Sequence, residues 1–125
     1  MIAGCSSGIE PLFALCYHKH NILGGESLLY VDNGFEKVAR EDGFYSEALM
    51  EYLADGGSLQ DRVDVPDWAK RVFVTSADIS PEMHVRMQAA FQRHTDNAVS
   101  KTVNFSNHAT VEDVRTVYDL AYELG

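Results

Sequence analysis

The sequence predicts an α/β fold that is mostly helical and contains a few short strands. Three observations carry this prediction: apolar residues recur at helical spacing in several segments, other short segments have strand character, and glycine or proline separates the segments. The 125 residues suffice for one domain with a modest core. The chain shows neither an internal repeat nor a low-complexity linker, so we expect residues 1–125 to form a single domain.

A loop rich in glycine and serine opens the chain at residues 4–11. Its small residues allow a tight turn and offer N–H and hydroxyl groups to an anion. Glu10 adds an acid, and Pro11 fixes φ and removes a donor. The spacing matches neither the P-loop nor the dinucleotide-binding fingerprint. By pattern alone, an ordinary turn that enters a buried apolar segment is the simpler interpretation.

A short strand and a helix are predicted next. The turn Gly24-Gly25 precedes strand-like residues 27–31. Asn33 is expected to cap a helix over residues 34–41, with Glu36 three residues after the cap.

A second helix is expected to begin after Ser46 and to end at Gly56-Gly57, which is a typical helix stop. Its apolar stripe consists of Leu49, Met50 and Leu53. A polar connector then leads to a short helical stretch over residues 67–73, where Trp68 is interpreted as a core anchor.

Two longer helices are predicted in the second half of the chain. Ser80-Pro81 is a strong helix start, and that helix should run to about His94. Its expected core face is Met83, Met87, Ala90 and Phe91. Thr110 and Asp113 resemble a capping box for the last helix. Its expected inward residues are Val114, Val117, Tyr118, Ala121 and Leu124.

Between these helices, residues 98–105 alternate in character, which predicts a strand. One face is small and polar and includes Ser100, Thr102 and Asn104, whereas the other carries Val99, Lys101, Val103 and Phe105. The polar face suits the inside of a barrel near a polar ligand. A half-solvated edge strand fits the same pattern equally well.

Net charge, hydropathy and cysteine content exclude several functional classes of protein. The formal net charge of −9 argues against direct nucleic-acid binding, which needs a basic face, but a local donor group can still hold a small anion. There is no apolar run of membrane-spanning length. The two cysteines do not form a disulfide framework, so we expect a cytoplasmic protein.

Cysteine and histidine also raise the question of a metal. Cys5, Cys16, His18 and His20 lack the paired spacing of a metal site, and we predict no metal. A small Cys/His metal-binding protein or thiol hydrolase remains an alternative.

Several motifs resemble one family. Residues 4–15, GCSSGIEPLFAL, resemble the SSGIEP segment of ribonucleotide reductases, above all the adenosylcobalamin-dependent (class II) enzymes. Further segments resemble later motifs of that family in the same order: residues 57–66, 73–82, 84–92 and 95–105. The resemblance covers nearly the whole chain but only a late part of the larger catalytic subunit.

This resemblance implies a late segment of a ten-stranded α/β barrel. In that family adenosylcobalamin generates a cysteine thiyl radical that reduces ribonucleotides to deoxyribonucleotides. The N-x-C-x-E motif of the radical cysteine is absent here, and the family's PTGTIS phosphate loop would end just before Met1. We therefore expect no catalytic residue in this chain, no binding of adenosylcobalamin by this chain alone, and a partner in the remainder of the catalytic subunit.

The resemblance also implies binding residues. Cys5, Ser6, Ser7, Gly8 and Glu10 are expected to support the substrate diphosphate from behind the groups that touch it. Ser100, Thr102 and Asn104 are expected to line the barrel near the substrate or the corrin.

Four cations receive no role at this stage: Arg40, Arg71, Arg86 and Lys101. The isolated chain should be inactive and should self-associate, because missing barrel strands leave apolar surface exposed. A non-catalytic module that completes a split enzyme in trans is the alternative.

Overall fold

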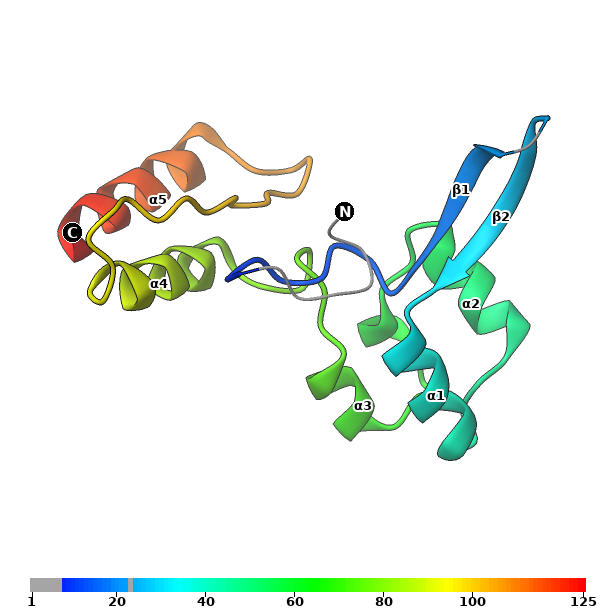
Figure 1. Ribbon diagram of the computed structural model, residues 1–125. Coiled ribbons are helices and arrows are strands. Elements are labelled where there is room, and N and C mark those ends of the chain that lie inside the picture. The colour runs from blue at the N-terminus through cyan, green and yellow to red at the C-terminus, as the bar shows by residue number, and fades with distance from the viewer. Residues whose placement is uncertain (1–7, 23) are drawn as a thin grey trace. The chain divides into compact units, whose positions relative to one another are not determined.

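The computed structural model describes residues 8–22 and 24–125, and these form a mixed α/β chain that is mostly helical, as the sequence predicts (Figure 1). The described residues form two compact units. The first contains Leu12–Thr75, and the second contains residues 8–11 together with Ser76–Gly125.

The first unit begins with an antiparallel hairpin of β1 (Cys16–Ile22) and β2 (Glu26–Val31). Tyr17 pairs with Tyr30, and their ring centroids lie 4.8 Å apart. Gly24 and Gly25 make the turn with φ angles of 106° and 102°, which residues other than glycine rarely adopt. The predicted turn and second strand are therefore confirmed.

Helix α1 (Asn33–Glu41) and helix α2 (Glu47–Ala54) follow the hairpin. The predicted cap of α1 was wrong by one residue, because Asp32 accepts the hydrogen bond from the Phe35 N–H at 2.9 Å and Asn33 is already helical. Ser46 caps α2 as predicted, with its hydroxyl 3.1 Å from the Leu49 nitrogen.

The core of the first unit is formed by side chains from these helices, from a 3-10 turn (Leu59–Asp61) and from helix α3 (Asp67–Val72). Phe35 is fully buried and meets the ring of Phe73 edge-on at 5.1 Å. Trp68 is not the buried anchor that the sequence predicted, because 39% of it is exposed. Its ring lies edge-on to the core residue Phe44, with the ring centroids 6.3 Å apart.

The second unit is built on helix α4 (Pro81–Gln92) and helix α5 (Val111–Leu124), which pack against each other. Ser80 caps α4, and Thr110 forms the predicted capping box on α5. No described helix has the length and apolar character needed to span a membrane.

The predicted buried face of α4 is wrong, and that of α5 is right only in part. Met83, Met87 and Phe91 are 53%, 42% and 51% exposed, whereas the buried residues of α4 are His84, Val85 and Ala89. On α5 only Val117 is buried. Periodicity finds an apolar stripe correctly, but the neighbours that pack against the helix decide which face is buried.

Residues 98–105 were expected to be a strand, and the structure assigns none there. A strand requires a neighbouring strand for its backbone hydrogen bonds. Here side chains bind the backbone instead: Gln92 Oε1 accepts from the Val99 N–H at 2.9 Å, and Gln88 Nε2 donates to the Val99 carbonyl at 2.6 Å.

Candidate functional site

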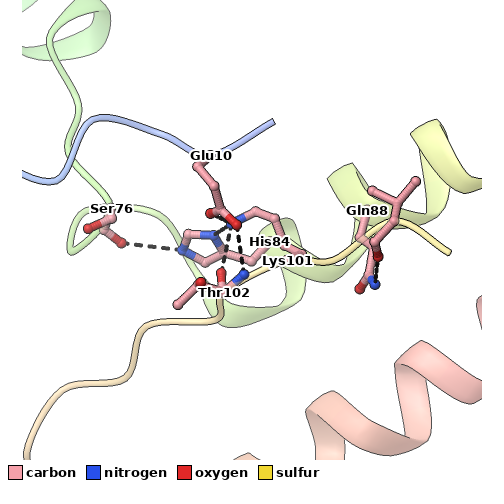
Figure 2. A network of polar contacts seen from close by, with 7 residues as sticks. Glu10, Ser76, His84, Gln88, Lys101 and Thr102 are labelled. Carbon is pink, nitrogen blue, oxygen red and sulfur yellow. Dashed lines mark hydrogen bonds and ion pairs between the residues drawn. The ribbon is translucent and has the colours of Figure 1, made fainter. Parts of the chain in front are cut away.

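A buried ammonium group lies at the centre of the second unit's polar contacts. The Lys101 side chain is 1% exposed. Its Nζ lies 2.6 Å from Glu10 Oε2, 2.7 Å from the Thr102 carbonyl oxygen and 2.9 Å from His84 Nδ1 (Figure 2). An ammonium has three donors, so these acceptors use its full capacity. We call Glu10, His84, Lys101 and Thr102 the Lys101 cluster.

Glu10 connects the opening loop to the segment around Lys101. Its Oε2 accepts from the lysine, and its Oε1 accepts from the Thr102 N–H at 2.8 Å. Burial by itself would raise the pKa of Glu10, but the hydrogen bonds from Lys101 and Thr102 and the nearby positive charge lower it overall. The carboxylate is therefore ionised at neutral pH and pairs with the ammonium.

His84 is held as a neutral ring. Lys101 has no acceptor, so the His84 Nδ1 that faces it accepts a hydrogen bond and carries no proton. Nε2 then carries the proton and faces the Ser76 carbonyl oxygen at 3.3 Å. Burial, followed by the charge of Lys101, lowers the pKa of His84. The side chain is 1% exposed, and both ring nitrogens are engaged.

Helix α4 positions this cluster through residues four apart, which lie on one helix face. His84 contacts Lys101, Gln88 binds the Val99 carbonyl, and Gln92 binds the Val99 N–H. Segment 99–102 is thus attached to α4 by side-chain hydrogen bonds. The cluster is electrically balanced, as burial of an ion pair requires.

The structure brings together two of the predicted site residues, Glu10 and Thr102. Gly8 adopts a φ of 70°, consistent with a turn in the loop. The predicted Cys5, Ser6 and Ser7 lie outside the described residues.

The other two predicted lining residues differ in exposure. Ser100 is exposed, and Asn104 is half-buried. Asn104 lines a hollow of about 500 Å³ with Ser80, Ser106, Asp113 and Thr116.

Sequence reasoning missed His84 and Lys101. Lys101 carried a usable signal, because it is a charged residue on the bulkier, otherwise apolar face of the alternating segment. A lysine in that setting must either reach water or find acidic and carbonyl partners. His84 had no such signal, since it lies beside the apolar stripe of its helix.

Cys16 lacks the properties of a nucleophile. It is 1% exposed, and its Sγ lies 3.6 Å from Met50 Sδ. Burial, with smaller contributions from the charges of Asp32 and Glu36, raises its pKa to about 12. Burial therefore disfavours the thiolate form of this residue at neutral pH.

The histidine candidates lie on the hairpin of the first unit. The rings of His18 and His20 are 6.0 Å apart on one face of β1, and His18 Nε2 lies 3.1 Å from Glu51 Oε2. Within residues 8–22 and 24–125, no group of three or more His, Cys, Asp or Glu side chains is placed to hold a metal ion.

Comparison with known proteins identifies relatives along the whole chain. The family described as "Ribonucleotide reductase, barrel domain" matches residues 1–125. The vitamin B12-dependent ribonucleoside-diphosphate reductase of Thermoplasma acidophilum is 48% identical over 124 residues, which cover 99% of this chain and 16% of that protein.

More distant relatives give the same result. The corresponding enzyme of Mycobacterium tuberculosis is 42% identical over 98% of this chain and 18% of its own length. The vitamin B12-dependent ribonucleotide reductase of Streptantibioticus cattleyicolor is 34% identical over 96% of this chain and 21% of its own length. The chain thus spans about a fifth or less of these relatives. It belongs to the ribonucleotide reductase family, as a segment of the barrel domain.

Proposed function

We propose that this chain is the late barrel segment of a ribonucleotide reductase that makes deoxyribonucleotides by thiyl-radical chemistry with adenosylcobalamin. The match to the barrel family over residues 1–125 is the observation that carries the proposal. In this proposal the radical cysteine belongs to the remainder of the catalytic subunit. The raised pKa of Cys16 supports that division, because a buried thiol of this kind is a poor reactant at neutral pH.

His84 and Lys101 do not fit a ligand role toward cobalamin. His84 is buried, and both of its ring nitrogens are engaged, by Lys101 and by Ser76. The Lys101 ammonium likewise has no donor left for a ligand. The proposed part of this chain in the reaction is to position the Glu10 end of its opening loop.

That loop is the proposed contribution to substrate binding. Ser6 and Ser7 offer hydroxyl and N–H groups that support the substrate diphosphate, and Glu10 holds the end of the same loop. Ser100, Thr102 and Asn104 remain proposed barrel-lining residues. Both units are proposed to belong to one barrel domain.

Exposed apolar side chains support an incomplete assembly. Met83, Met87 and Phe91 form a half-exposed stripe on α4, and Tyr118 and Tyr122 on α5 are 73% and 89% exposed. In the intact enzyme the remainder of the catalytic subunit would cover such surface. In the isolated chain the same surface favours self-association.

A hybrid enzyme tests the proposal. These 125 residues replace the matching segment of the Thermoplasma acidophilum relative, and reduction of a ribonucleoside diphosphate is measured with adenosylcobalamin present. We expect the hybrid to be active and the isolated chain to be inactive. The variant Ser6→Ala/Ser7→Ala should raise KM for the diphosphate. An inactive but folded hybrid would contradict the proposed function, and an unchanged KM would remove the role of the serines.

Adding the chain in trans distinguishes the alternative. If this chain restores activity to a relative that lacks the matching segment, the chain acts as a separate assembly module. Activity only in the covalent hybrid favours a segment of one polypeptide. Size-exclusion chromatography of the mixture shows whether a complex forms in either case.

A further inference from the structure

The Lys101 cluster fixes the position of Glu10, which lies in the opening loop. Glu10 and Lys101 are 91 residues apart, and Thr102 is 92 residues from Glu10. The two carboxylate oxygens of Glu10 bind different groups, one the ammonium and the other a backbone N–H (Figure 2). A carboxylate held at both oxygens has a fixed orientation, and Pro11 restricts the backbone directly after it.

The Lys101 ammonium is closed to ligands. All three donors of the ammonium are engaged, and the lysine side chain is 1% exposed. A lysine that binds a substrate phosphate must present a free donor to it. Lys101 therefore holds protein groups and does not contact substrate.

The segment on the other side of the cluster is also fixed. The side chains of Gln88 and Gln92 bind both backbone polar groups of Val99, and His84 accepts from Lys101 two residues later. Helix α4 thus holds segment 99–102, and this segment holds Glu10. Helix α4 therefore fixes the position of Glu10 through these successive contacts.

We propose that Glu10 and Lys101 are positioning residues that fix residues 8–11, the described end of the opening loop, to segment 99–102, and that binding of the substrate diphosphate depends on this attachment. This inference rests on the proposed function for its substrate. The interaction itself is a property of the 125-residue chain. Glu10 holds the loop directly, and Lys101 acts through Glu10.

The first test uses the 125-residue chain and does not depend on activity. We compare Glu10→Gln, Lys101→Met and the double variant with Lys37→Met as control, because the Lys37 side chain is 72% exposed. Each single variant leaves the other charge of the pair without its partner and should lower Tm, by about 10 °C in Glu10→Gln, where the remaining charge is the buried ammonium. The double variant removes both charges, so its loss should be clearly smaller than the sum. Simply additive losses would overturn the proposal.

Nitrogen NMR of the imidazole rings provides a readout that does not require a destabilised variant. At neutral pH we expect His84 to show a proton on Nε2 and a free Nδ1. In Lys101→Met the Nδ1 resonance should shift, while Lys37→Met leaves it unchanged. A proton on Nδ1 in the unmodified chain contradicts the cluster, because two donors cannot face each other.

The second test measures positioning in the hybrid reductase. Glu10→Gln and Lys101→Met should raise KM for the ribonucleoside diphosphate about tenfold, with a smaller change in kcat, because the displaced loop weakens diphosphate binding. Lys37→Met should leave both constants unchanged. Unchanged KM in a stable Glu10→Gln hybrid overturns the positioning role. An inactive unmodified hybrid instead overturns the proposed function, while the Tm and NMR results still decide the interaction.

Discussion

Lys101 Nζ and Glu10 Oε2 lie 2.6 Å apart although 91 residues separate them in the sequence. The lysine side chain is almost fully buried, whereas the Glu10 side chain is 26% exposed. An ion pair in this setting contributes to stability only when the remaining donors are also satisfied. His84 and the Thr102 carbonyl meet that condition here.

The first prediction concerns pH and His84. Its pKa lies below the ordinary value of 6.5, so the folded chain binds fewer protons than the unfolded chain just below that pH. The free energy of unfolding should therefore fall as pH decreases through about 6.5. Urea unfolding at pH 7.5 and pH 5.5 measures the loss. In His84→Gln the slope over this interval should flatten, and an equal slope would contradict the assignment.

Glu10 should add a second loss at lower pH. Its pKa is lowered from the ordinary value of 4.5, so its contribution is complete above 4.5 and is lost as pH falls through its folded pKa. Urea unfolding below pH 5 measures this step. Glu10→Gln should remove it. A mutant that retains the same acid loss would show that other carboxylates cause it.

The third prediction concerns the cap of α1. Asp32→Ala removes the oxygen that accepts from the Phe35 N–H and should cost about 1 kcal/mol of unfolding free energy. Asn33→Ala, one residue later, is the matched control and should cost much less, because Asn33 is not the cap. Chemical denaturation of both variants distinguishes them. Equal costs would restore Asn33 as the capping residue.

The fourth prediction concerns the glutamines of α4. Gln92→Ala removes the acceptor of the Val99 N–H and should lower the free energy of unfolding by about 1 kcal/mol. Arg93→Ala, at the exposed end of the same helix, is the control. Amide hydrogen exchange at Val99 should accelerate in Gln92→Ala only. Unchanged exchange would mean that this hydrogen bond does not protect the amide.

The fifth prediction concerns the exposed stripe of α4. Met87→Glu/Phe91→Glu should reduce self-association of the isolated chain without unfolding it, because both side chains are about half exposed. Light scattering measures the mass, and circular dichroism checks the helices. In the hybrid reductase the same change should lower activity, since the stripe would then face the rest of the subunit. Unaltered mass would remove the stripe from the association surface.

Local chemistry explains which predictions succeeded. Ser46, Ser80 and Thr110 cap helices through bonds to residues only three positions away, so neighbouring sequence is enough to place them. The glycine turn of the hairpin is equally local. The motif resemblance identified the barrel family because it extends over the whole chain.

The amino-acid sequence by itself thus determined the caps of α2, α4 and α5, the hairpin turn and the family. Only the tertiary structure decided that His84 is buried while Met83 and Phe91 are exposed, and that residues 98–105 bind side chains in place of a neighbouring strand. It also decided the role of Lys101, which depends on a glutamate at the other end of the chain. The physical reason is that burial and ion pairing depend on neighbours brought together by folding, whereas caps and turns depend on neighbours along the chain.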